Sequence, residues 1–85
     1  MAIVFIPPQL RQLTGAAQVE IEGGNIREVV EQMDSKFPGI ADRLLDNGEL
    51  SPALQFSVDH VMTRILSTKV KPKTEIHFLP VIGGG

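Results

Sequence analysis

The chain has 85 residues, of which 42% are hydrophobic and 21% are charged, and its formal net charge is -2 at pH 7. These values predict one small folded domain rather than a disordered chain. The sequence contains no cysteine, which excludes disulfides, thiolate zinc sites and a cysteine nucleophile, and it has four phenylalanines without tryptophan or tyrosine, which argues against a base-stacking nucleic-acid surface.

No stretch reaches the roughly 18 apolar residues of a membrane helix, and the N-terminus lacks the basic and apolar regions of a signal peptide. We therefore expect a cytoplasmic protein that contacts neither membrane nor nucleic acid. The one dense basic stretch runs from Lys69 to Lys73 and contains a proline, so we interpret it as an exposed turn.

Residues 2–6 are all apolar and mostly branched, which predicts a strand covered on both faces and central in its sheet. Pro7 and Pro8 end this strand because neither can donate to a ladder. After a turn-rich connection, residues 18–22 alternate polar and apolar side chains, as a half-buried strand does. The two strands are predicted to form an antiparallel hairpin.

A helix is predicted to begin after Asn25, which is a favourable N-cap with Glu28 three residues later. Its apolar residues recur at helical spacing and predict one buried stripe, formed by Ile26, Val29, Val30, Met33 and Phe37. Pro38 and Gly39 end the helix. Residues 40–45 could add one or two helical turns before Asn47–Gly48.

Residues 54–58 alternate again and predict a third strand, followed by a turn at Asp59–His60. The segment 61–66 is ambiguous between irregular structure and a short strand. A second turn at residues 71–73 leads into a last strand over residues 75–79. The economical fold is α+β, with a mixed sheet of four to five strands packed on one main helix.

The first and last strands are expected to be neighbours. One face would then carry an apolar patch for docking a partner, and the other would pack under the helix. The predicted outer set is Val4, Ile6, His77, Leu79 and Val81. The predicted inner set is Ile3, Phe5, Ile76 and Phe78.

The sequence contains no phosphate-binding glycine loop, no metal-ligand cluster and no nucleophile–base pair. His60 and His77 stand alone, and a metal site would need partners that the sequence does not identify. We expect no metal site and no catalytic constellation within the chain itself.

The chain ends in an apolar run that passes into Gly83, Gly84 and Gly85. Glycines gain little as structure, because they lose the most conformational entropy on ordering and have no side chain to pack. A chain without Cβ atoms can, however, enter a narrow slot and present its carboxylate to a ligand. The alternative interpretation is a frayed end, which is common at termini.

Five segments in order resemble the ubiquitin-like sulfur-carrier family, which includes the molybdopterin synthase small subunit (MoaD) and the thiamine-pathway carrier (ThiS). They are Ile6–Pro7 with Leu10–Arg11 and Thr14–Gly15, Arg27–Val30, Pro38–Ile40, Arg43–Asp46, and Leu79–Ile82 before Gly84–Gly85. The segment that opens with Ile6–Pro7 and the pair Pro38–Ile40 and Arg43–Asp46 look closest to the carriers of cysteine biosynthesis. The resemblance implies a β-grasp (ubiquitin-like) fold, with a domain over residues 1–82 and a flexible reactive tail over residues 83–85.

The resemblance also implies a mechanism. An E1-like enzyme uses ATP to adenylate the carboxylate of Gly85, next to Gly84, and a sulfur donor displaces AMP to leave a thiocarboxylate. The chain would be a protein co-substrate rather than an enzyme and would bind no cofactor of its own. Its residues expected to bind partners are Ile6, His77, Leu79, Val81, Ile82 and Gly83.

The implied partners are the E1-like adenylyltransferase/sulfurtransferase and a sulfur-accepting enzyme, either cysteine-synthase-like or the molybdopterin synthase large subunit. A cysteine-type pathway is favoured. Three alternatives stay open at this point: the small subunit of molybdopterin synthase in molybdenum cofactor biosynthesis, a ubiquitin-like modifier joined to lysines, and a plain binding module with an inert tail.

Overall fold

The structure is a computed structural model that describes residues 1–81. In chain order its elements are β1 (Ala2–Phe5), η1 (Pro8–Leu10), α1 (Arg11–Thr14), β2 (Gln18–Ile21), α2 (Ile26–Lys36), α3 (Ile40–Leu44), β3 (Leu45–Asp46), β4 (Glu49–Leu50), β5 (Leu54–Val58), β6 (Val61–Thr63) and β7 (Glu75–Pro80). Within residues 1–81, no helix combines the length and the apolar character that crossing a bilayer requires.

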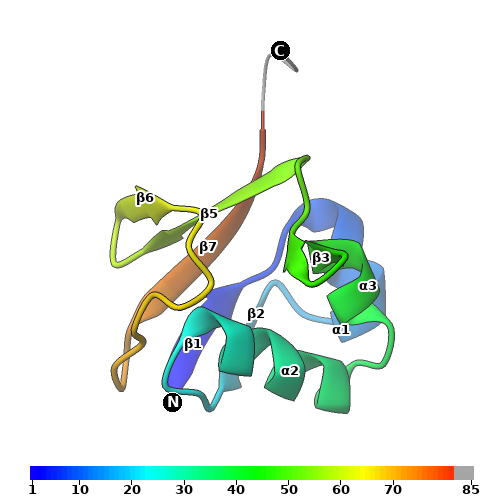
Figure 1. Ribbon diagram of the computed structural model, residues 1–85. Helices are drawn as coiled ribbons and strands as arrows, with labels where there is room; N and C mark the ends of the chain where they lie inside the picture. The colour runs from blue at the N-terminus through cyan, green and yellow to red at the C-terminus, as the bar shows by residue number, and fades with distance from the viewer. Residues whose placement is uncertain (82–85) are drawn as a thin grey trace.

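Five strands form one mixed sheet in the order β2-β1-β7-β5-β6 (Figure 1). β1 pairs with β2 in antiparallel register and with β7 in parallel register, and β5 is antiparallel to both β7 and β6. β3 and β4 form a separate two-stranded hairpin. The predicted α+β architecture is therefore confirmed, including the adjacency of the first and last strands.

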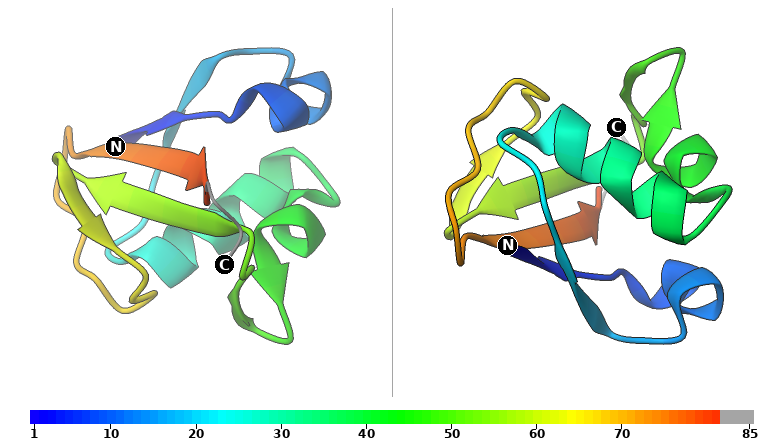
Figure 2. Two further views of the ribbon diagram at one scale, coloured as in Figure 1. Left: turned by 90° about the horizontal axis from the view of Figure 1, so that it is seen from above. Right: turned by 90° about the horizontal axis from the view of Figure 1, so that it is seen from below.

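α2 covers one face of the sheet and leaves the opposite face open (Figure 2). The helix begins where the sequence predicts, because the Asn25 side chain accepts a hydrogen bond from the Glu28 N–H at 2.9 Å. The Glu28 carboxylate in turn accepts from the Gly24 N–H at 2.8 Å, which completes a variant of the capping box. The predicted stripe of Ile26, Val29, Val30 and Met33 is buried, and Phe37 packs partly buried at the end of α2.

The predicted faces of β7 are confirmed, but those of β1 are wrong. Val4 and Ile6, predicted to lie outside, have exposures of 0% and 2% and belong to the core. The parallel register sets Val4 opposite Ile76 and Phe5 opposite His77, so Val4 faces the helix and Phe5 faces outward. In an uninterrupted apolar strand, no polar residue marks the outer side, and an error of one residue in register reverses both faces.

Five short elements, η1, α1, β3, β4 and β6, are not defined by the sequence pattern and appear only in the structure. The connection after β1 contains the short helices η1 and α1. Asn47 and Gly48 have φ values of 54° and 80° and close the β3–β4 hairpin. The ambiguous segment 61–66 begins with β6, which is joined to β5 through Asp59 and His60 at φ values of 49° and 72°.

Candidate functional site: the root of the C-terminal tail

The exit of the tail is set by β7, which lies between β1 and β5 in the sheet. Leu54 of β5 is the register partner of Pro80, whose ring nitrogen carries no hydrogen to donate. Val81 is the last described residue, and its N–H donates to the carbonyl of Ala53 at 2.9 Å. The chain therefore leaves the body at a point that is positioned from the β5 side, because the pairing of β1 with β7 ends at His77.

A row of side chains crosses the open face of the sheet beside this exit. The strand registers align Phe5 with His77, His77 with Ser57, and Ser57 with Met62. The rings of Phe5 and His77 stack with centroids 4.1 Å apart and planes within 4°. This stack places the imidazole in the middle of the open face.

Two more residues extend the row. The His60 ring lies 6.2 Å from that of His77, at an interplanar angle of 32°. Leu79, two residues further along β7, is 39% exposed, and Met62 is 49% exposed. We name the set Phe5, His60, Met62, His77 and Leu79 the outer patch. It is an apolar and aromatic surface that continues along β7 to the tail.

A pocket of about 330 Å³ lies on the other side of the exit, next to the Ser51–Leu54 turn. Its lining residues are Gln9, Leu10, Arg43, Ser51, Ala53, Leu54, Pro80 and Val81. Leu10 and Leu54 are buried, so they form an apolar floor, whereas Arg43 is exposed and supplies a positive charge at the rim. The pocket is a further candidate contact point for a partner beside the root of the tail.

The chemistry of this region is that of binding. Within the described residues, no group of three His, Cys, Asp or Glu side chains is placed to hold a metal ion. The outer patch offers apolar area and two imidazoles, and the pocket offers one guanidinium. These groups can recognise another protein, and the reactive group that the family resemblance implies is the terminal carboxylate of the chain.

Of the predicted partner-binding residues, three lie where the sequence places them. His77 and Leu79 belong to the outer patch, and Val81, 40% exposed, lies at the root of the tail. The prediction that Ile6 binds a partner is wrong, because its side chain is buried and cannot contribute to an exposed surface. The remaining predicted site residues, Ile82, Gly83, Gly84 and Gly85, lie outside the described residues.

Three members of the outer patch were missed at the sequence level. The sequence predicts Phe5 on the inner face, places Met62 in the ambiguous segment, and contains no pattern that links His60 to His77. One available signal could have placed Phe5 correctly. β2 alternates clearly, and a hairpin register that pairs Val4 with the half-buried Val19 sets Phe5 opposite the exposed Gln18.

The fold and the site together define a class. A helix packed across a five-stranded mixed sheet, with a central last strand that leads directly into a glycine-ended tail, is a ubiquitin-like β-grasp domain. The sequence profile of the ThiS family matches residues 4–85, and the chain belongs to that family of ubiquitin-like sulfur carriers. A comparison with curated proteins found no significant match.

Solved structures agree with this assignment. The chain is similar to the structure described as the Amycolatopsis orientalis BexX/CysO complex, with a TM-score of 0.92 and 29% identity over 100% of both chains. It is also similar to Mycobacterium tuberculosis CysO, described as an antigen, with a TM-score of 0.91 and 26% identity over 96% of this chain and 100% of that one. The small archaeal modifier protein 1 of Methanosarcina acetivorans shares the fold, with a TM-score of 0.83 and 21% identity over 99% of this chain and 95% of that one.

Proposed function

We propose that this protein is a sulfur carrier whose Gly85 carboxylate is adenylated by an E1-like enzyme and then converted to a thiocarboxylate that donates sulfur in a biosynthetic pathway. The observation that carries the proposal is the extent of the family match, which includes both the folded body and the terminal glycines. A cysteine-type pathway is favoured, supported by the likeness to two CysO proteins.

The chemistry explains why the carrier needs an activating partner. A carboxylate is a poor acyl donor until a good leaving group is attached to it. Attack of the Gly85 carboxylate on the α-phosphate of ATP forms the acyl-adenylate and releases pyrophosphate. A sulfur nucleophile then attacks the acyl carbon and expels AMP, which leaves the sulfur on the carrier. ATP is a substrate of the partner, and the chain is its protein co-substrate.

The body supports this role by supplying surface around the tail. The outer patch is proposed to dock the activating enzyme and, in turn, the sulfur-accepting enzyme, while the residues after Val81 enter the active site. One of the solved similar structures is itself a complex of a CysO protein with BexX, which supports a partner enzyme for a carrier of this shape. Apolar area in the centre of the patch would provide most of the affinity.

The test is intact-mass measurement after incubation with a cognate activating enzyme, ATP and a sulfur donor. A sulfur carrier gains the mass difference between one sulfur and one oxygen. A thiol-alkylating reagent then adds its alkyl group to the new thiocarboxylate, which raises the mass again. Ladders of adducts on lysines would instead indicate a protein modifier. An unchanged mass under conditions that activate a known carrier would contradict both.

Variants of the tail make the test specific. Deletion of Gly84 and Gly85 should abolish thiocarboxylate formation. Gly83→Ala should be nearly silent, whereas Gly84→Val should impair adenylation strongly because a branched side chain meets the walls of a narrow pocket. One residue added after Gly85 should inactivate the chain, since it displaces the carboxylate by about 3.3 Å or more. Pyrophosphate exchange measures each variant, and an active extended chain would exclude Gly85 as the activated terminus.

The pathway is tested by the choice of acceptor. A thiocarboxylated carrier is offered to a cysteine-synthase-like enzyme and, separately, to a molybdopterin synthase large subunit. Turnover with the first supports the cysteine-type pathway. Turnover only with the second would assign the chain to molybdenum cofactor biosynthesis.

A further inference from the structure

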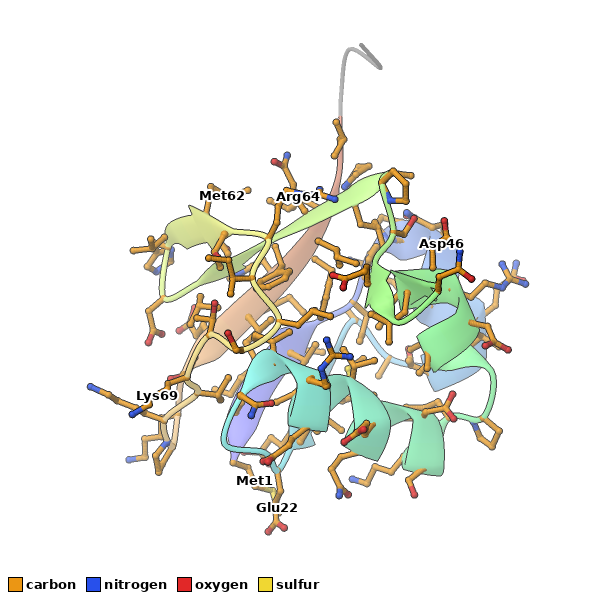
Figure 3. All side chains as sticks on the ribbon, in the orientation of Figure 1. Met1, Glu22, Asp46, Met62, Arg64 and Lys69 are labelled. Atoms are coloured by element: carbon orange, nitrogen blue, oxygen red, sulfur yellow. The ribbon has the colours of Figure 1, made fainter. Side chains whose placement is uncertain are left out.

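The segment 61–66 places one arginine close to the exit of the tail. Arg64 directly follows β6, and its guanidinium reaches the start of β5. It donates to the carbonyl of Leu54 and, at 3.4 Å, to the carbonyl of Ser51. Figure 3 shows Arg64 toward the end of the molecule where β7 finishes, whereas Met1 and Lys69 lie toward the opposite end.

The two carbonyls that Arg64 binds are the two ends of a tight turn. The Leu54 N–H donates to the Ser51 carbonyl at 3.0 Å, and the Ser51 hydroxyl accepts from the Ala53 N–H at 3.3 Å. A planar guanidinium can hold two acceptors in one fixed arrangement, which a lysine ammonium on a flexible stem does less well. Arg64 therefore braces the turn from outside.

The same turn holds the root of the tail. The carbonyl of Ala53, between the two braced residues, accepts the hydrogen bond from the Val81 N–H. Because Pro80 has no N–H, this bond is the first that the chain can donate after Leu79. Movement of the turn thus changes the position of the last described residue before the tail.

We propose that Arg64 is a positioning residue that holds the Ser51–Leu54 turn and thereby orders the root of the tail at Val81. A tail whose root is already ordered loses less conformational freedom when it enters a partner. The effect on activation rests on the function proposed above, whereas the bracing is a property of the free chain. Loss of Arg64 should therefore raise the KM for the carrier and leave kcat unchanged, because the chemistry at Gly85 is not altered.

Hydrogen exchange of single amides tests the brace directly in the free protein. In Arg64→Ala, the Val81 amide should exchange about tenfold faster than in the wild type, while the Phe78 amide in the same strand, which follows global stability, changes by less than about twofold. Arg64→Lys should be intermediate, since one ammonium cannot span both carbonyls.

Arg27→Ala is the matched control, because Arg27 is also an exposed arginine that donates to a backbone carbonyl, that of Gly48 at 3.0 Å. Its Val81 exchange should equal that of the wild type. If Val81 exchange in Arg64→Ala is unchanged, or rises only in proportion to that of Phe78, the brace is refuted.

Kinetics with the activating enzyme test the consequence. Arg64→Ala should raise the KM for the carrier in pyrophosphate exchange by about fivefold with kcat within about twofold, and Arg27→Ala should match the wild type. A fall in kcat at unchanged KM would overturn the positioning role. If the wild type is not activated while Val81 exchange responds to Arg64, the proposed function fails and the brace stands. If the wild type is activated but Val81 exchange does not respond to the loss of Arg64, the brace is refuted and the proposed function stands.

Discussion

The two faces of β7 differ in their exposure to solvent, although residues of both faces alternate along the same strand. Ile76 and Phe78 point toward α2 and have exposures of 0% and 2%, whereas Leu79 is 39% exposed on the opposite side. All three side chains are apolar, so hydrophobicity alone does not distinguish them. The inner side chains stabilise the domain by leaving water on folding, while the outer ones are only partly buried and can become fully buried only when a partner docks. Four predictions test this division in β7 and in the neighbouring β1.

The largest effect is expected when a charge replaces a fully buried side chain of the neighbouring strand. Val4→Asp puts a carboxylate at a position with 0% exposure and should cost more than about 4 kcal/mol of unfolding free energy, enough to unfold much of the population. Urea denaturation followed by circular dichroism measures it. Phe5→Asp is the matched control on the outer face, and a greater loss of stability in this control would reverse the assigned faces of β1.

Truncation of the inner side of β7 should come next. Phe78→Ala removes a buried ring that lies 5.7 Å from the ring of Phe56, and it should lower the free energy of unfolding by about 3–5 kcal/mol. Leu79→Ala in the same assay should lower it by less than about 1.5 kcal/mol, because its side chain keeps much of its contact with water. Equal losses in the two variants would show that the outer patch is part of the core.

The outer side of β7 should matter for binding. Leu79→Asp places a charge in the outer patch and should weaken the complex with the activating enzyme by about 30-fold, which corresponds to about 2 kcal/mol. Titration calorimetry gives the affinity, and thermal unfolding of the same variant checks that the domain is intact. Unchanged affinity in a folded variant would move the docking surface away from the outer patch.

The smallest effect concerns the ring stack on the outer face. His77→Ala removes the imidazole that stacks on Phe5 and should cost about 1 kcal/mol of stability, since both rings are only half buried. His77→Phe retains an aromatic face and should recover most of that loss. Chemical denaturation compares the two, and equal destabilisation by both variants would mean that stacking contributes nothing.

Local chemistry made much of the fold predictable. The Asn25 cap, the stripe from Ile26 to Met33 and the stop at Pro38–Gly39 depend on residues close in sequence, and α2 forms as these signals predict. The alternation of β5 and β7 likewise identified their buried faces. The motif order across the chain also pointed to the sulfur-carrier family, which the profile match over residues 4–85 bears out.

Other features were decided by tertiary structure because they depend on pairing between distant segments. The faces of β1 follow from its parallel register with β7, about 70 residues away, and the uniformly apolar sequence of β1 contains no signal that favours one face. The outer patch exists only because the pairing of four strands, β1, β7, β5 and β6, brings Phe5, His77 and Met62 into one row. The sequence by itself determined α2, the strands β1, β2, β5 and β7, and the terminal glycines. The sheet decided which side chains surround the point where the tail begins. Those neighbours are set by the hydrogen-bonded register between strands, and the composition of each strand does not specify that register.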